Sequence, residues 1–247
     1  MIGAKREVAV VTGGSKGIGK AIVQLLADKG YAVAILDILD GQELAEQINA
    51  KGGDALFVHT DVSSESQVVH AAELIRKTLG KPTVLVNNAA IYPRCPILGM
   101  TLELWDQVLS VNLTGTFLCS KIFAIDMIDE SKGVIVNISS ERGLDGKKNA
   151  AHYSVSKAGM ISLMKTMVLE WSPDIRINTI LPGVTDTDQA RGAGISDDEL
   201  YAQGESIPLK RIGTPEDVAG VVGFLIGKEA EYITGQCICV NGGAMMH

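Results

Sequence analysis

A tyrosine and a lysine lie four positions apart in the stretch Tyr153-Ser154-Val155-Ser156-Lys157. On a helix, residues with this spacing share one face and lie one turn apart. A free phenol has a pKa of roughly 10 and exchanges protons poorly near neutral pH, whereas a neighbouring ammonium favours the phenolate and lowers that pKa. The pair therefore predicts an acid/base unit that interconverts C–OH and C=O. Solvated helix surfaces carry the same spacing, so this hypothesis depends on the rest of the chain.

The second candidate site is a glycine-rich loop that reads Thr12-Gly13-Gly14-Ser15-Lys16-Gly17-Ile18-Gly19. Its glycines permit a tight turn and a close approach of the backbone to a pyrophosphate. A helix pattern follows directly, and its N-terminus supplies free N–H groups and the positive end of the helix dipole. The loop therefore favours a dinucleotide site over an ordinary glycine-rich turn.

Two other motifs overlap the same loop. Gly13 to Gly17 fits the G-x-S-x-G pattern of a hydrolase nucleophile elbow, but the loop follows the first strand and no downstream histidine has an evident partner. Gly14 to Lys20 nearly fits a phosphate-binding P-loop, which needs Ser or Thr next to hold Mg²⁺, whereas this chain has Ala21. Both motifs are disfavoured against the dinucleotide site.

The elements that must position these residues follow from the hydrophobic pattern. The predicted strands are 8–11, 33–36, 55–58, 84–86, 134–138, 175–181 and 236–240. The predicted helices are 18–30, 41–51, 63–79, 101–128, one that carries residues 153 and 157 and ends near 171, 197–202, and one that begins at Pro215. This alternation predicts βαβ units and a doubly wound α/β fold, in which a parallel sheet has helices on both faces. A single domain spans 1–247.

Polar and turn-forming residues gather where the predicted strands end. Ligands bind at the carboxyl ends of the strands in such sheets, and the residues there are Thr12, Asp37, Asn87, Ser140 and Pro182. The Asp37 carboxylate could accept hydrogen bonds from both hydroxyls of an adenosine ribose, and it would repel a 2′-phosphate. Asp61-Val62 could lie beside the adenine, and Asn88-Ala89 would let the backbone approach the cofactor.

Bulk composition disfavours several other classes of function. The chain has 247 residues, of which 46% are hydrophobic and 21% charged, as expected of a soluble globular domain. A net charge of −7 argues against general binding to nucleic acids or anionic membranes. No apolar run approaches the roughly 18 residues of a membrane span, and residues 1–7 lack the apolar core of a signal peptide. Four cysteines without a CxxC pair and four scattered histidines predict a reduced, cytoplasmic protein without a metal site.

Taken together, these residues resemble the short-chain dehydrogenase/reductase family. The resemblance covers nearly the whole chain and rests on the Thr12–Gly19 loop, Asp61-Val62, Asn87-Asn88-Ala89, Asn112, Ser140, Tyr153 with Lys157, and Pro182-Gly183. The family's Asn-Asn-Ala-Gly motif ends here in Ala90, a mild departure. The resemblance implies a Rossmann-like sheet of about seven strands. It also implies a homotetramer built on helices 101–128 and 152–171 and on the last strand.

The resemblance also implies a role for each catalytic residue. Tyr153 donates or removes the hydroxyl proton, and Lys157 lowers the pKa of Tyr153 and bonds the nicotinamide ribose. Ser140 hydrogen-bonds the substrate oxygen; it is chosen over Ser139 because the family's serine lies 13 residues before the tyrosine and three before a glycine, here Gly143. Asn112 would hold a water that links Lys157 to solvent.

The cofactor implied is NAD(H), with NADP less favoured because of Asp37, although a basic residue such as Lys16 accompanies NADP in some family members. Thr187 matches a threonine that bonds the nicotinamide carboxamide. The residues expected to contact the cofactor are Gly13, Ser15, Lys16, Gly17, Ile18, Gly19, Asp37, Asp61, Val62, Asn88, Ala89, Tyr153, Lys157, Pro182, Gly183, Thr185 and Thr187.

The substrate pocket is expected to lie between the loops after the fourth and fifth strands and the polar segment 184–214. Its candidate substrate contacts are Tyr92, Arg94, Arg142 and His152, with Glu141, Lys147 and Arg191 as further candidate linings. The excess of basic side chains favours a small polar secondary alcohol, sugar-like or carrying a carboxylate, with Arg142 as its best single contact. Solvated loop residues would give the same excess. Two alternatives remain: a 3-oxoacyl carrier-protein-type ketoreductase of the same family, and a non-catalytic dinucleotide-binding regulator.

Overall fold

Strands and helices alternate along the chain in the computed structural model, which describes residues 6–192 and 196–246. The strands within these ranges are β1 (Val8–Thr12), β2 (Ala32–Asp37), β3 (Asp54–His59), β4 (Pro82–Asn87), β5 (Gly133–Ile138), β6 (Ile175–Pro182) and β7 (Cys237–Val240). The longer helices are α1 (Gly17–Asp28), α2 (Gln42–Ala50), α3 (Glu65–Thr78), α4 (Leu102–Leu109), α5 (Gly115–Asp129), α7 (Ala151–Trp171), α9 (Asp197–Ser206) and α10 (Pro215–Leu225). Short helical turns are η1 (Ile97–Gly99), η2 (Ser110–Thr114), α6 (Arg142–Asp145), α8 (Asp188–Gly192) and η3 (Lys228–Ala230).

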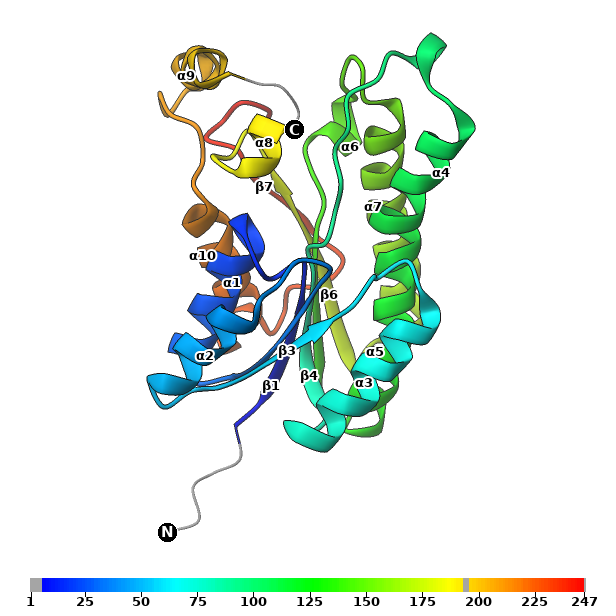
Figure 1. Ribbon diagram of the computed structural model, residues 1–247, viewed down its shortest axis with the longest axis vertical. Coiled ribbons are helices and arrows are strands. Elements are labelled where there is room, and N and C mark those ends of the chain that lie inside the picture. Colours follow the sequence, from blue (N-terminus) through cyan, green and yellow to red (C-terminus); the bar gives the residue numbers. More distant parts are fainter. Residues whose placement is uncertain (1–5, 193–195, 247) are drawn as a thin grey trace.

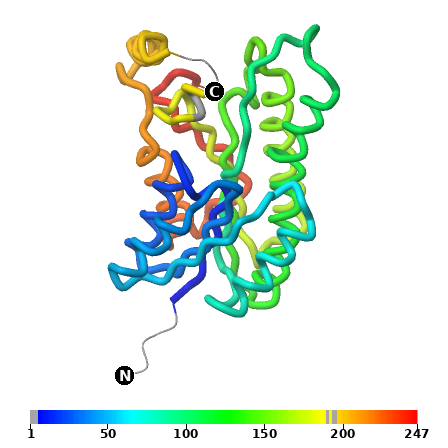
Figure 2. The backbone as a smooth tube through the Cα atoms, viewed as in Figure 1, coloured from blue at the N-terminus to red at the C-terminus, as the bar shows by residue number. Residues whose placement is uncertain are grey.

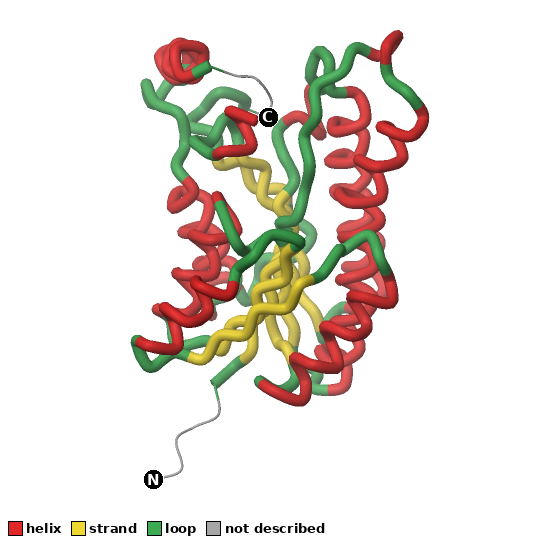
Figure 3. Tube along the Cα trace, viewed as in Figure 1, coloured by secondary structure: helices red, strands yellow, loops and turns green. Residues whose placement is uncertain are grey.

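The strands form one parallel sheet in the order β3-β2-β1-β4-β5-β6-β7. Helices α1, α2 and α10 cover one face and α3, α5 and α7 the other, so the predicted doubly wound α/β fold is confirmed (Figure 1). The chain reverses its winding direction between β1 and β4, which is the switch point where ligands bind in such sheets. The loops at the carboxyl ends of the strands gather at one end of the molecule (Figure 3).

The apolar runs of the strands are buried because the sheet has a core on each side. Val8 and Val10 of β1 belong to the core under α3, α5 and α7. Ala9 and Val11 belong to the core under α1, α2 and α10. Successive side chains of a strand point to opposite faces, so a strand buried on both faces needs a continuous apolar run. This requirement explains why the strands were predictable from the sequence.

The helix predicted over 101–128 is interrupted by a short π-helical turn, which separates two α-helices. Thr101 caps its N-terminus by accepting a hydrogen bond from the backbone N–H of Leu104 at 3.2 Å. After α4 the backbone passes through the π-helical turn η2 and continues as α5. Such single π turns occur often at functional sites, and Asn112 lies in this one.

The same stretch, Leu102–Asp129, is long and apolar enough to span a membrane by length and composition. Its most apolar window is 56% buried within the molecule, and Phe123 and Met127 belong to the core under α3, α5 and α7. Packing against the sheet therefore accounts for its hydropathy.

Segment 184–214 leaves the sheet after β6 and returns beside its own starting point (Figure 2). Thr185 pairs with Gly213 in an isolated parallel bridge, and the N–H of Gly213 donates to the carbonyl of Val184 at 2.9 Å. The predicted short helix at 197–202 is α9, which begins with a capping box between Ser196 and Glu199. The two ends of the segment are therefore held together by backbone contacts, next to the carboxyl ends of the strands.

Candidate active site

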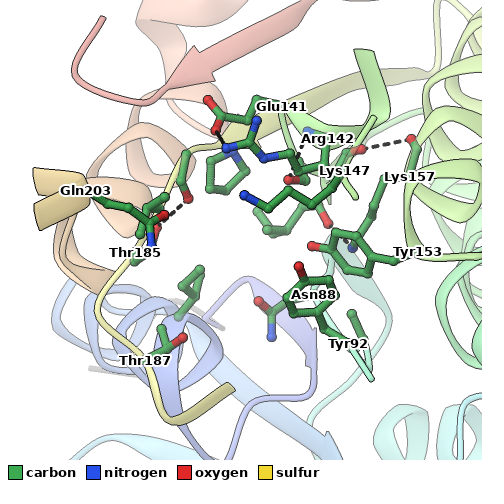
Figure 4. Close-up of a pocket in the computed structure, with 18 residues that line it drawn as sticks. Asn88, Tyr92, Glu141, Arg142, Lys147, Tyr153, Lys157, Thr185, Thr187 and Gln203 are labelled. Atoms are coloured by element: carbon green, nitrogen blue, oxygen red, sulfur yellow. Dashed lines mark hydrogen bonds and ion pairs between the residues drawn. The ribbon is translucent and has the colours of Figure 1, made fainter. Parts of the chain in front are cut away.

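Two connected cavities lie at the carboxyl ends of the strands. The larger, of about 480 Å³, runs from the glycine loop past the ends of β2 and β3. The smaller, of about 150 Å³, lies between the ends of β5 and β6 and the start of α7 (Figure 4). The residues that line both are Ile18, Asn88, Ala90 and Thr187. The two cavities form one groove, as expected for an extended cofactor with a substrate at one end.

The glycine loop is shaped so that only glycine fits at two positions. Gly13 has a φ of +62°, and a Cβ there would lie 2.8 Å from the Cα of Ala89. A Cβ on Gly19 would lie 2.0 Å from the carbonyl oxygen of Gly13. The loop thus brings its backbone against both α1 and the end of β4, leaving the N-terminus of α1 open to the larger cavity.

Thr12 and Asn88 join the ends of β1 and β4. The Thr12 hydroxyl oxygen accepts hydrogen bonds from the backbone N–H groups of Asn88 and Ala89, both at 3.0 Å. The Asn88 side-chain amide donates to the carbonyls of Thr12 at 3.0 Å and Gly13 at 2.9 Å. Sequence reasoning placed Thr12 at the strand end and at the start of the glycine loop, without a bonding role. Its structural role here is to fix the loop that borders the groove.

Asp37 closes β2 at the wall of the larger cavity and is only 8% exposed. Its carboxylate accepts hydrogen bonds from the backbone N–H groups of Ser15 at 2.9 Å and Leu39 at 3.0 Å. It thereby stabilises the glycine loop, which the sequence did not indicate. Asp61 and Val62 line the same cavity, next to the end of β3.

Most residues predicted to bind the cofactor line the groove. The larger cavity is lined by Gly13, Lys16, Gly17, Ile18, Asp37, Asp61, Val62, Asn88, Ala89 and Thr187, and the smaller also by Tyr153, Lys157, Pro182, Gly183 and Thr185. Ser15 and Gly19 line neither. Ser15 acts through its backbone bond to Asp37, and Gly19 is buried in the first turn of α1.

The two adjacent serines at the end of β5 have different partners, as their opposite directions predict. The Ser139 hydroxyl donates to the carbonyl of Lys157 at 2.9 Å. The Ser140 hydroxyl accepts from the backbone N–H of Arg142 at 3.2 Å and shares a hydrogen bond with Tyr153. Ser140 is therefore the serine beside the phenol, whereas Ser139 ties β5 to α7.

Gly143 makes the close packing behind these serines possible. A Cβ on Gly143 would lie 2.9 Å from the carbonyl carbon of Lys157 and 3.0 Å from the nitrogen of Ala158. Because glycine has no Cβ, α6 can lie directly against the backbone of α7. The Ser140-to-Gly143 spacing used in the sequence analysis thus has a packing reason.

At the smaller cavity Lys157 is buried and Tyr153 is half-buried. Burial raises the pKa of Tyr153 to about 12, against a lowering by its hydrogen bond with Ser140. Burial lowers the pKa of Lys157 to about 7. The ammonium donates to the carbonyl of Ile138 at 2.8 Å and lies 5.6 Å from the centroid of the Tyr153 ring.

The direction of the Tyr153 shift therefore differs from the sequence expectation. Proximity to a lysine lowers the pKa of a phenol only when the lysine carries its charge, and burial opposes that charge here. Among the groups acting on Tyr153, the Ser140 hydrogen bond and the more distant Arg142 lower its pKa.

Asn112 is fully buried in the π-helical turn η2 and does not line either cavity. Its amide donates to the carbonyl of Ile91 and to the hydroxyl of Ser156, both at 3.1 Å, and its oxygen accepts from the Ile91 N–H at 2.8 Å. Both amide protons are thus used within the protein. Asn112 therefore joins the loop after β4 to α7, and its expected part in holding a water beside Lys157 stays a prediction.

Two of the four predicted substrate contacts line the smaller cavity. The Tyr92 ring lies 4.5 Å from the Tyr153 ring, centroid to centroid, at an interplanar angle of 53°, and Arg142 lines the cavity wall. Arg94 is exposed and does not line it. His152 is fully buried, and its Nδ1 accepts from the backbone N–H of Tyr153 at 2.8 Å. The predictions for Arg94 and His152 therefore lack support from the geometry.

Only some of the further candidate residues line the smaller cavity. Glu141 and Lys147 line the smaller cavity, whereas Arg191 forms ion pairs with Asp186 at 2.7 Å and Asp197 at 2.9 Å and does not. The structure adds Gln203 of α9 to the cavity wall, which sequence reasoning missed. The only signal for it was its place in the segment expected to cover the pocket.

The groove has the features that a nicotinamide dinucleotide needs. It offers a glycine cradle that a Cβ would fill at Gly13, an open helix N-terminus and a carboxylate at the far end, Asp37. The smaller cavity places Ser140, Tyr153 and Lys157 next to the residues shared by both cavities. The donor set thus fits a dinucleotide along the larger cavity, with its reactive end toward the phenol.

Comparisons with known proteins agree with this geometry. A family model described as "Enoyl-(Acyl carrier protein) reductase" matches residues 13–245. The 3-oxoacyl-[acyl-carrier-protein] reductase FabG of Aquifex aeolicus is 40% identical over 241 residues, covering 96% of each chain. The structure of the aldohexose dehydrogenase of Thermoplasma acidophilum superposes with a TM-score of 0.89 at 35% identity, over 97% of this chain and 94% of that chain.

A third relative is a structure assigned as an NAD(P)-dependent gluconate 5-dehydrogenase of Beutenbergia cavernae, with NADP bound at low occupancy. It superposes with a TM-score of 0.90 at 34% identity, over 96% of both chains. Each relative is matched along nearly its whole length, and all three are oxidoreductases by name. The chain is an oxidoreductase that belongs to the short-chain dehydrogenase/reductase family, whose members bind a nicotinamide dinucleotide.

Proposed function

We propose that the protein catalyses hydride transfer between NAD(H) and a small polar secondary alcohol or its ketone. The observation that carries this proposal is the meeting of Ser140, Tyr153 and Lys157 in one cavity that continues into the dinucleotide groove. A complete set of this kind argues against the non-catalytic regulator, which would not need it.

The roles of the residues follow from their positions. When bound, the nicotinamide supplies the hydride acceptor for oxidation and the hydride donor for reduction. Ser140 donates a hydrogen bond to the substrate oxygen and holds it beside the phenol. In oxidation, ionised Tyr153 takes the hydroxyl proton as the C–H hydride leaves; in reduction, the neutral phenol returns a proton to the forming alkoxide. Lys157 stabilises the phenolate when its ammonium is charged.

We propose NAD(H) as the preferred cofactor. A 2′-phosphate bound along the larger cavity would meet the Asp37 carboxylate, which is held in place by two backbone N–H groups. The NADP in the Beutenbergia cavernae structure and Lys16 in the loop favour the opposite preference. We give Asp37 more weight because its position is fixed by hydrogen bonds.

The substrate has a second candidate. The similarity to a 3-oxoacyl-[acyl-carrier-protein] reductase favours an acyl thioester. The cavity of about 150 Å³, with the charged side chains of Glu141, Arg142 and Lys147 on its wall, favours a small polar substrate. We further propose that the enzyme acts in the cytoplasm as a homotetramer. Its exposed apolar helix faces support this assembly.

The test is a panel assay of secondary alcohols, polyols, hydroxy acids and a 3-oxoacyl thioester with both NAD(H) and NADP(H). We expect NAD⁺-dependent oxidation of a small polar alcohol. Tyr153→Phe should lower kcat by about 10³-fold or more, because the proton acceptor is lost, while NADH binding measured by fluorescence stays within about threefold. Near-normal turnover by Tyr153→Phe, or turnover of the thioester alone, would contradict the proposal.

A further inference from the structure

Arg142 and Lys147 place two cationic groups on the wall of the smaller cavity, and their charges are balanced differently. The guanidinium of Arg142 forms ion pairs with Glu141 at 2.9 Å and with Asp145 at 2.6 Å. Within residues 6–192 and 196–246, the ammonium of Lys147 forms no hydrogen bond or ion pair. Arg142 is therefore already paired with carboxylates of the protein, whereas the ammonium of Lys147 is left to pair with a ligand.

Lys147 lies on a turn whose backbone is fixed on both sides. Gly146 before it has φ 73° and ψ 174°, a conformation that only glycine adopts readily. Asn149 after it has a φ of +62° and accepts a hydrogen bond from the N–H of Cys95 at 2.7 Å. A parallel bridge between Cys95 and buried Ala150 fastens the turn to the loop after β4. The position from which the lysine reaches the cavity is thus set in advance.

The side chain of Lys147 extends over the cavity toward the wall that carries Gln203 (Figure 4). Tyr153 and Ser140 line the same cavity on the α7 side. A substrate whose carbinol oxygen lies at the phenol would therefore direct the rest of its chain between Lys147 and Gln203. Such a substrate meets an unpaired ammonium and an amide before it reaches solvent.

We propose that Lys147 binds the carboxylate of the substrate and that the enzyme acts on hydroxy acids and the corresponding keto acids. This inference rests on the proposed oxidoreductase function and specifies its substrate class. An anion at this point would be attracted by the unpaired ammonium and also by the nearby Arg94, which acts on Lys147 electrostatically. A neutral polyol could use Gln203 but would leave the ammonium without a counter-charge.

The lowered pKa of Lys147 agrees with this assignment. Burial and the positive charges of Arg142 and Arg94 lower it, and Asp145 and Glu141 raise it. A bound carboxylate would offset the repulsion among the three cations. The substrate would thus complete a charge balance that the protein leaves incomplete.

The test compares substrates that differ only in the group at one end, a carboxylate in one and a neutral hydroxymethyl in the other. The first pair is 3-hydroxybutyrate and 1,3-butanediol, and the second is gluconate and glucitol. The two pairs sample a short and a long separation between the reacting carbinol and the end group. We expect the wild-type enzyme to have a higher kcat/KM for the carboxylate of at least one pair, by about tenfold or more. Lys147→Met should raise KM for that carboxylate about tenfold or more with a smaller change in kcat, and should alter the neutral partner less than threefold.

Two further variants separate charge from structure. Lys147→Arg keeps the positive charge and should retain most of the carboxylate preference. Lys148→Met removes a charge from the neighbouring position, which is exposed and does not line the cavity. This variant should leave kcat and KM unchanged for both members of the pair. A binding measurement without turnover uses calorimetry of the NAD⁺-loaded enzyme with butyrate and with butyramide. We expect tighter binding of butyrate, and Lys147→Met should remove the difference.

The outcomes distinguish the two proposals. If the enzyme oxidises neutral alcohols at least as well as carboxylates, or if Lys147→Met affects both members of a pair equally, the inference about Lys147 is wrong and the oxidoreductase function stands. If no alcohol or ketone in the panel is turned over with either cofactor, the proposed function itself fails, and the inference fails with it.

Discussion

Lys157 is a cation that the fold buries almost completely, being 2% exposed. Burial lowers its pKa from 10.5 to about 7, so between these pH values the unfolded state binds more protons than the folded state. Stability should therefore rise with pH from about 7 to about 10, because the cost of burying the charge is full below pH 7 and is relieved as the folded lysine loses its proton.

Lys157→Met removes this dependence. We expect the wild-type free energy of unfolding, minus that of Lys157→Met, to increase by the order of a few kcal/mol between pH 7 and pH 10. Urea denaturation across this range measures it. Lys165→Met, which removes an exposed lysine from the same helix, is the control and should show no such trend. A difference that stays constant with pH would mean that Lys157 is not neutralised by burial.

Asp37 should decide the choice between the two dinucleotides. We expect kcat/KM with NAD⁺ to exceed that with NADP⁺ by about tenfold or more, because a 2′-phosphate beside a fixed carboxylate is repelled. Asp37→Ser should narrow this ratio by about tenfold, although it also removes the bonds to Ser15 and Leu39. Asp40→Ser is the matched control, since Asp40 is exposed and does not line the groove. A higher kcat/KM with NADP⁺ for the wild-type enzyme would contradict the proposed preference for NAD(H).

The contact between α6 and α7 gives a prediction about a whole element. Gly143→Ala would place a Cβ 2.9 Å from the backbone of Lys157, so α6 must shift away from α7 and carry Ser140 and Arg142 with it. We expect a loss of about 1–3 kcal/mol in stability and a fall in kcat greater than the fall in NADH affinity. Gly220→Ala in α10 has open space around its Cβ and should be neutral or slightly stabilising. Equal behaviour of the two variants in thermal unfolding and turnover would contradict this packing.

The elements were predictable where burial alone decides the pattern. All seven strands of the described ranges are within two residues of their predicted bounds. The five inner strands are buried on both faces and need an uninterrupted apolar run, whereas the edge strands β3 and β7 are only partly buried. The π-helical turn at Asn112 was not predictable, since the amphipathic pattern of 101–128 continues through it and only the hydrogen bonds to Ile91 and Ser156 reveal why it is there. The turns α6 and α8 were missed because four or five residues carry no clear period.

The candidate site was predictable to the extent that strand ends meet at one edge of a parallel sheet. That rule brought the glycine loop, Asp37 and Ser140 together with α7. It could not show which side chains point into the pocket, so Arg94 and His152 were expected there and Gln203 was not. Nor could it reveal that Arg142 pairs with Glu141 and Asp145 whereas Lys147 is left unpaired.

The assembly of the whole molecule is predicted by the outer faces of α5 and α7. These helices cover one side of the sheet, and their outward side chains include exposed apolar residues: Phe117, Ile125, Ile128, Val155 and Leu169. Large exposed apolar groups on one side of a molecule favour an interface, and two copies of the pair of helices could bury them against each other. We expect light scattering at micromolar concentration to give about 105 kDa, four times the 26.2 kDa of the chain.

Ile125→Glu should shift the mass to a smaller species, because a charge would be buried at the helix contact. Val69→Glu, on exposed α3 surface, should leave the mass unchanged. A wild-type monomer at this concentration, or the same mass for both variants, would show that these helix faces do not form the interface.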